Sequence, residues 1–327
     1  SSAQISKLST DQLVALTTDQ IPLLTSAQVS ALTDAQAPSL ETADIAKLTT
    51  AQISLLSGGA IAALTSDQLK AITVADFGKL TTAQIVALTD AQVPSLTTDQ
   101  VAALTSVQLP KMQTADFAAL TTAQVVALGT NQIEFLTTGQ ITNMTTAQVA
   151  AIEVADLKKF SADQITALTS DQMSSLTVTQ IAGLSTAQLQ AVDAPEFGLL
   201  TTAQIQALTT DQMPALTNAQ VSALTDNQVI AIETRDIAKL TPTQIAYLSA
   251  TQTPNLTSAQ IAALDSAQIA AMTPQGIAAL TGERMTLISA TQLAGMTSAQ
   301  IQGLTAPEIS KMSTAGSDYP HLVARFI

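Results

Sequence analysis

The chain has 327 residues, 46% of them hydrophobic, and its 12 Lys and Arg against 25 Asp and Glu give a formal net charge of −13. Basic residues this sparse and scattered argue against a nucleic-acid partner, because phosphate binding needs clustered Lys and Arg. The absence of Cys excludes disulfides, thiolate metal sites and cysteine nucleophiles. No run of about 18 apolar residues occurs, so the sequence predicts no membrane span.

An eight-residue repeat governs almost the whole chain. From Leu80 the sequence reads Leu-Thr-Thr-Ala-Gln-Ile-Val-Ala, and a matching octad starts at Leu88. We call the first residue of each octad the anchor. Apolar anchors stand at every multiple of eight from Leu8 to Met312, and 28 of these 39 anchors are Leu. The unit is therefore Leu-Thr-x-x-Gln-φ-x-x, where φ is apolar, and no insertion or deletion interrupts its register.

Neither a long helix nor a strand fits this spacing. A long amphipathic helix needs apolar residues that recur every 3.6 residues along one face. Apolar positions separated by five and then three residues do not form such a face, because each octad would rotate the pattern by about 80° around a continuous helix. The alternation of a strand is absent as well. The remaining interpretation is that every octad begins a new helical turn, which predicts an all-α solenoid of one-turn helices.

The polar residues of the octad support this interpretation. Thr-x-x-Gln has the spacing of a capping box, in which the Thr hydroxyl and the Gln side chain satisfy each other's backbone N–H groups. The anchor and φ fall at the positions of a hydrophobic staple. We therefore expect Gln84→Ala and Thr81→Ala each to cost about 1 kcal/mol, the usual cost of a lost cap.

Proline marks where each turn ends. Six prolines sit directly after φ, where Pro would break a continuing helix. They are Pro22, Pro38, Pro94, Pro110, Pro214 and Pro254. Their tolerance at this position predicts one helical turn followed by a short corner.

A longer period of about 40 residues, or five octads, is superimposed on the repeat. Most of the members of this series replace Gln by an acidic residue, and we call these the acid octads. Their acidic residues are Asp44, Asp76, Asp116, Asp156, Glu196, Asp236 and Glu308. The period suggests that five octads complete one turn of the coil, since five such segments would enclose a ring about 10 Å in radius that apolar side chains can fill.

These seven acids form the candidate site, as an acidic column along the surface. Stacked once per turn, they would bind cations or form a charged recognition stripe. The alternative is structural: an acid in the first turn of a helix favours the helix dipole and replaces Gln as the cap partner, with a following Lys neutralising it. Calcium needs six to eight converging oxygens, so one carboxylate per five octads favours the structural alternative.

No other constellation points to chemistry. The only histidine is His321, and no Gly-rich phosphate loop or nucleophile motif occurs, so we expect no catalytic residue, no metal and no cofactor. Phe77, Phe117 and Phe197 occupy φ in acid octads, where they fill the core or line a pocket. The register predicts a solenoid over residues 1–312 and an irregular C-terminal cap or tail over residues 313–327.

The Leu-Thr-Thr-Ala-Gln-Ile-x-Ala pattern resembles tandem Thr-Ala-Gln repeat regions of large bacterial surface or secreted proteins, over residues 1–312. The resemblance implies an extracellular or cell-surface location, although a cytoplasmic one stays open. Two non-enzymatic functions follow as expectations. One is a stalk, spacer, surface-layer or adhesin segment that serves other regions of a longer parent chain. The alternative is a solenoid module that binds protein or glycan through its regular face.

Overall fold

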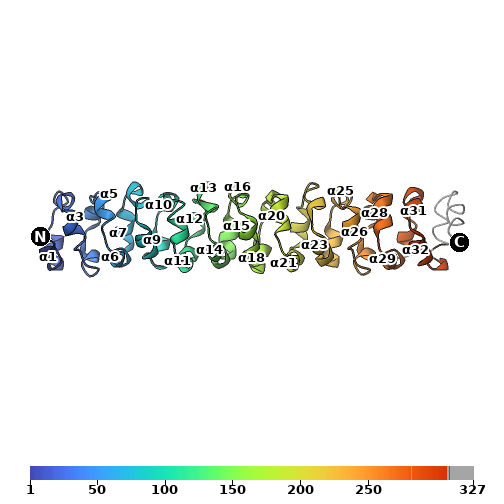
Figure 1. The fold of residues 1–327 in the computed structure, drawn as a ribbon, viewed down its shortest axis with the longest axis horizontal. Coiled ribbons are helices and arrows are strands. Elements are labelled where there is room, and N and C mark those ends of the chain that lie inside the picture. The colour runs from blue at the N-terminus through green and yellow to red at the C-terminus, as the bar shows by residue number, and fades with distance from the viewer. Residues whose placement is uncertain (281, 308, 310–327) are drawn as a thin grey trace. The chain divides into compact units, whose positions relative to one another are not determined.

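The computed structural model describes residues 1–280, 282–307 and 309, and across these residues it is built from short helices without a strand. Contacts divide the chain into two compact units, Ser1–Leu168 and Thr169–Ile327. Within each unit the helices follow one another in chain order (Figure 1). The predicted all-α solenoid of short helices is confirmed. The expected cap or tail at 313–327 lies outside the described residues.

The first unit contains seventeen α-helices and four 3₁₀ helices. They are α1 (Ser2–Ile5), α2 (Thr10–Val14), η1 (Ile21–Leu23), α3 (Ser26–Val29), η2 (Ala37–Ser39), α4 (Thr42–Ile45), α5 (Thr50–Ile53), α6 (Gly58–Ala63), α7 (Ser66–Ala71), α8 (Val74–Phe77), α9 (Thr82–Val86), η3 (Val93–Ser95), α10 (Thr98–Ala102), η4 (Leu109–Lys111), α11 (Thr114–Ala118), α12 (Thr122–Val126), α13 (Thr130–Ile133), α14 (Thr138–Asn143), α15 (Thr146–Ala151), α16 (Val154–Leu157) and α17 (Ala162–Thr166).

The described part of the second unit continues in the same way. Its helices are α18 (Ser170–Ser175), α19 (Val178–Gly183), α20 (Thr186–Gln190), α21 (Ala194–Gly198), α22 (Thr202–Gln206), η5 (Met213–Ala215), α23 (Asn218–Ala223), α24 (Asp226–Ala231), α25 (Thr234–Ile237), α26 (Pro242–Ile245), η6 (Thr253–Asn255), α27 (Ser258–Ala263), α28 (Ser266–Ala271), α29 (Pro274–Ala279), α30 (Gly282–Met285), α31 (Ala290–Gly295) and α32 (Ser298–Gln302).

Capping boxes start most of the α-helices. In α9 the backbone N–H of Gln84 donates to Thr81 Oγ1 at 3.2 Å, and the N–H of Thr81 donates to Gln84 Oε1 at 2.8 Å. Thr81 itself is extended, so the chain changes direction at the cap before the turn begins. Such short helices are unstable in isolation. These caps therefore define where each turn starts, while packing must supply its stability.

The six proline octads form 3₁₀ turns in place of α-helices. In each of η1 to η6, Pro is the second of three residues and follows a residue in the φ position. Pro has no N–H to donate to the residue four positions before it, and the N–H groups of the next two residues donate three residues back, as Ser95 does to Gln92 and Leu96 to Val93 in η3. The 3₁₀ turn begins at φ and continues through Pro to the next residue, so the prediction that the helix is already ending after φ is wrong in these octads.

Successive turns of the coil lie between three and four octads apart. Helices three octads apart pack together, as α4 does with α7, α11 with α14 and α28 with α31. Gln side chains bond to backbone carbonyls 28 and 31 residues earlier, as Gln84 does with Leu56 and Ile53. The predicted turn of five octads is therefore wrong, and about three and a half octads complete a turn. That prediction treated each octad as a straight segment, whereas its corner takes up part of the path.

The core is a column of anchors and φ residues inside the coil. Almost every described anchor and φ side chain is buried, apart from the anchors Leu8, Leu16 and Leu24 at the N-terminal edge. Phe77, Phe117 and Phe197 are fully buried, so they fill the core and line no pocket. Gly78 follows Phe77 where two turns come close: a Cβ there would lie 2.9 Å from the carbonyl oxygen of Ala103.

Candidate functional site

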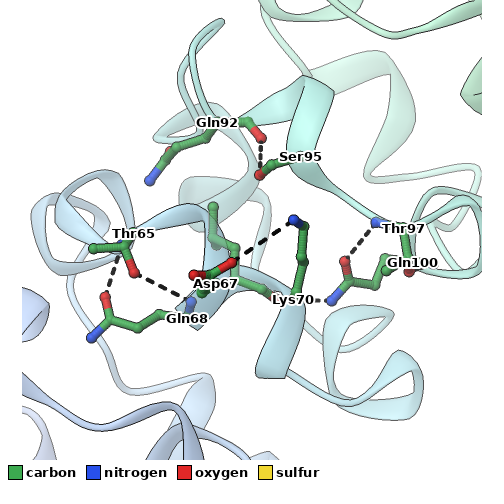
Figure 2. A network of polar contacts seen from close by, with 9 residues as sticks. Thr65, Asp67, Gln68, Lys70, Gln92, Ser95, Thr97 and Gln100 are labelled. Atoms are coloured by element: carbon green, nitrogen blue, oxygen red, sulfur yellow. Dashed lines mark hydrogen bonds and ion pairs between the residues drawn. The ribbon is translucent and has the colours of Figure 1, made fainter.

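The fifth position of the octad holds the polar residues that connect the turns. Gln100 is typical: its Oε1 accepts from the N–H of Thr97 at 3.0 Å, and its Nε2 donates to the carbonyls of Leu69 and Ile72, both at 2.8 Å. Only 1% of Gln100 is exposed. Figure 2 shows this cap beside the equivalent pair Thr65 and Gln68. One carboxamide thus closes a local cap and joins two turns of the coil.

This pattern repeats through both units, and we call it the amide ladder. Its acceptors are the carbonyl of the anchor 28 residues earlier and, in most cases, that of the φ residue 31 residues earlier. Members of the ladder are Gln36, Gln52, Gln68, Gln84, Gln92, Gln100, Gln108, Gln124, Gln132, Gln140, Gln148 and Gln164 in the first unit, and Gln204, Gln212, Gln220, Gln228, Gln244, Gln252, Gln260, Gln268, Gln292 and Gln300 in the second.

The sequence revealed the cap but not the ladder. A capping box accepts Glu or Gln at its third helical residue, yet in this chain Gln greatly outnumbers Glu there. Only the amide carries N–H groups that can reach a second turn. The preference for Gln over Glu was the sequence feature that could have indicated the ladder. It could be interpreted only once the structure showed which backbone carbonyls lie within reach of the Gln side chains.

The predicted acidic residues occupy the same position as the ladder amides, but they do not form a surface column. Asp44, Asp116, Asp156 and Asp236 are buried, with exposures between 1% and 6%. Asp76 and Glu196 are partly exposed, and Glu308 lies outside the described residues. A spacing of five octads does not match a turn of about three and a half, so successive acids point to different sides of the coil. The predicted stacking is therefore wrong.

The two partly exposed acids have hydroxyl partners. Asp76 accepts from the hydroxyls of Thr73 in its own octad and Thr50 in the preceding turn, both at 2.5 Å. Glu196 accepts from the hydroxyl of Ser170 at 3.4 Å. At both acids the carboxylate accepts a hydrogen bond from a hydroxyl in the preceding turn. In the amide ladder the fifth-position side chain donates to the preceding turn instead.

The buried acids lack such partners. Both carboxylate oxygens of Asp44, Oδ2 of Asp116 and Oδ1 of Asp236 are buried without a hydrogen-bond donor. In the helices that contain these acids, the side chain of the N-cap residue makes no cap bond. At Asp116 and Asp236 no hydrogen bond from the cap N–H to the acid is found in the described residues, so the expectation that the acid simply replaces Gln as the cap partner is wrong there.

Burial raises the pKa of all four buried carboxyls. It raises the pKa of Asp116 to about 6, with a smaller contribution from the negative charge of Asp90 in the preceding turn. Burial also dominates the raised pKa of Asp156, to which Glu153 adds. For Asp44, burial raises the pKa and outweighs the backbone N–H of Glu41, which lowers it, while the negative charge of Glu41 adds to the rise.

Asp236 is the one buried acid that forms an ion pair with a basic side chain in the described residues. Arg235 Nε lies 3.6 Å from Asp236 Oδ2 and 2.8 Å from Glu233 Oε2. Burial still raises the pKa of Asp236, although Arg235 lowers it. No ion pair joins an acid octad to the Lys that follows it anywhere in the described chain. The predicted neutralisation by Lys47, Lys159 and their equivalents is not found there.

Two further features of the described residues concern metal binding and membrane insertion. No group of three or more His, Cys, Asp or Glu side chains is close enough to hold a metal ion. None of the described helices has the length and apolar character needed to cross a membrane.

Comparison with protein families gives a repeated match. The model of the ALTTAQ repeat matches seven overlapping or separate stretches that together cover more than half of the chain. They are residues 1–26, 37–74, 69–106, 109–146, 149–186, 229–266 and 254–282. A comparison with curated proteins finds no match.

Proposed function

Because the chain belongs to the ALTTAQ repeat family, and because one set of contacts joins its turns throughout each unit, we propose that it is a non-enzymatic structural spacer. The single observation that carries this proposal is the amide ladder. Each turn is held to the one before it by the same buried bonds, so no individual octad is essential and length can vary by whole octads.

The parent setting is part of the same proposal. The spacer would form a stalk, surface-layer or adhesin segment of an extracellular or cell-surface bacterial protein, with other regions of a longer chain as its immediate partners. The resemblance to Thr-Ala-Gln repeat regions supports this location. A net charge of −13 supports solubility for a chain that is 46% hydrophobic.

The spacer function can be tested by measuring distance inside the first unit. The chain has no Cys, so Lys47→Cys and Lys159→Cys, both at exposed positions, provide two specific sites for spin labels. Fourteen octads separate them, or about four turns, which at a helix-packing distance near 10 Å gives roughly 40 Å. Deleting seven octads, residues 81–136, removes two turns and should shorten the distance to about 20 Å.

A matched variant separates length from local sequence. Here each of the same seven octads is replaced by Thr-Thr-Ala-Gln-Ile-Ala-Ala-Leu, which keeps the anchors at multiples of eight, and the distance should stay near that of the parent chain. If the distance between the two spin labels were unchanged by the deletion, the spacer function would be contradicted. The binding-module alternative would prevail if a protein or glycan bound saturably and the replacement abolished that binding at an unchanged distance.

A further inference from the structure

The buried acids correspond in register to backbone carbonyls that have lost their donor. In a ladder octad the anchor carbonyl 28 residues earlier accepts from Gln Nε2, as Leu80 does from Gln108 at 2.6 Å. The equivalent anchors for Asp44, Asp116 and Asp236 are Leu16, Leu88 and Leu208. Within the described residues, no hydrogen bond reaches the carbonyl oxygen of any of these three. The register of the ladder therefore pairs each buried carboxyl with an anchor carbonyl that also has no hydrogen-bond donor.

Two acceptors without a donor are unfavourable in a buried position. A buried polar group without a partner costs about 1–3 kcal/mol, and more when it is charged. A carboxylate has only acceptors, whereas a protonated carboxyl has one O–H donor. A proton is also the smallest species that can supply the missing donor, and the unpartnered carboxyl oxygens are closed to solvent.

We propose that the acid octads are proton-dependent joints, in which the neutral carboxyl of Asp44, Asp116 or Asp236 donates to the preceding turn and the ionised carboxylate does not. Asp156, which has the same position and burial, is the fourth member. The joints recur along both units between stretches of amide ladder. Protonation thus strengthens the contacts between turns at defined intervals, while the ladder between them is insensitive to pH.

At Asp116 and Asp156 a neighbouring acid favours the neutral form of the carboxyl. Asp116 faces Asp90 from the preceding turn, and α14, which packs on its helix, has no titratable side chain. Asp156 has Glu153 in its own octad, and α13, which packs on its helix, ends beside Glu134.

At the other two joints the surrounding charges partly cancel. Asp44 has Glu41 in its own octad, and α7 brings Asp67 and Lys70, which lie 3.9 Å apart. Asp236 has Glu233 and Arg235, and α27, which packs on its helix, has no titratable side chain. Every joint therefore holds a second acid nearby.

The pH window follows from the raised pKa of Asp116. The pKa of its carboxyl rises from 3.8 to about 6 on folding, so the folded chain binds this proton more tightly than the unfolded chain does. The resulting stability is complete below pH 3.8 and is lost as the pH rises through about 6. A shift of about two pKa units corresponds to a change on the order of a hundredfold in the local opening equilibrium.

Hydrogen exchange of the full chain can test the joint at Asp116. Protection of the backbone amides in residues 113–120, corrected for the intrinsic effect of pH, should fall at least tenfold between pH 4.5 and pH 8. Asp116→Gln restores the ladder residue and should remove most of this dependence. Asp116→Asn has the size of Asp without its charge, and it should also remove the dependence, so the result does not rely on one variant.

A control variant accounts for the general effect of charge. Asp99→Gln removes the same charge from an exposed position in the first turn of α10, and it should leave the pH dependence at residues 113–120 unchanged. The proposal fails if protection in the parent chain does not fall as pH rises. It also fails if Asp116→Gln and Asp116→Asn retain the dependence of the parent chain, or if Asp99→Gln removes it equally well.

Discussion

At the scale of single residues, the most consequential side chain is the Gln of the fifth position. It makes the bond expected of a cap, and it also makes two bonds to the preceding turn that no local pattern required. Gln84 is 1% exposed and takes part in all three, with Thr81, Ile53 and Leu56. Such a buried and fully bonded amide fixes the spacing between turns as well as the start of a helix.

This combined role changes the expected cost of removing the side chain. Thr81→Ala should cost about 1 kcal/mol, as a lost cap does. Gln84→Ala should cost about 3 kcal/mol, because it removes three hydrogen bonds and leaves two buried carbonyls without their amide donor. Urea unfolding of the full chain, followed by circular dichroism, measures both changes.

Gln84→Glu is the informative companion variant. It retains the cap acceptor at nearly the same shape but places a negative charge beside the carbonyls of Ile53 and Leu56. At pH 7 it should be at least as unstable as Gln84→Ala, and acid should recover part of the loss. Equal losses of about 1 kcal/mol for Thr81→Ala and Gln84→Ala would show that the ladder contributes little.

At the scale of elements, the octad accommodates either an α-turn or a 3₁₀ turn between the same two apolar positions. The anchors on both sides of η3 are buried just as they are on both sides of α9. Only the residue after φ decides between the two forms, since Pro cannot donate the bond that lengthens the helix. The corner between octads is therefore fixed by the anchors and the caps.

The equivalence of the two forms can be tested by moving proline by one position. Val86 follows φ in α9 and is 43% exposed, so Val86→Pro should convert α9 into a 3₁₀ turn at a cost of about 1 kcal/mol. Ala87→Pro should cost about 3 kcal/mol, because the N–H of Ala87 donates to the carbonyls of Ala83 and Gln84. Similar losses in thermal unfolding for both variants would contradict the assignment of the corner.

At the scale of the molecule, the octads are interchangeable in their contacts. Every ladder amide reaches an anchor carbonyl 28 residues earlier, whichever octads are involved. Each unit therefore depends on the register of the repeat more than on the identity of any particular octad. The register also continues without interruption from the first unit into the second.

Two deletions of different length can show whether stability depends on the register of the repeat or on the number of residues. Removing residues 121–128 takes out one whole octad, so each later Gln still finds an anchor carbonyl at the same offset. Removing residues 121–124 takes out half an octad and places the fifth residue of each later octad, in most cases Gln, where an anchor belongs. The first variant should keep a cooperative thermal transition within a few degrees of the parent chain. The second should lose several kilocalories per mole of stability, because buried carbonyls and amides no longer meet. An equally stable half-octad variant would contradict this dependence on register.

The sequence by itself determined the local structure of this protein. Caps are interactions within one octad, so Thr81 and Gln84 were enough to predict where turns begin. The burial of Phe77 also followed, because its position in the octad is that of a core residue.

Only the tertiary structure decided how octads in neighbouring turns contact one another. The length of a coil turn depends on corner angles that summed local preferences do not specify, so about three and a half octads complete it and not five. For the same reason the acids could be recognised as a series, while their burial and their unpaired carbonyl partners could not. Asp116 corresponds in register to Leu88, 28 residues earlier, only because the packing of the core sets the length of one turn of the coil.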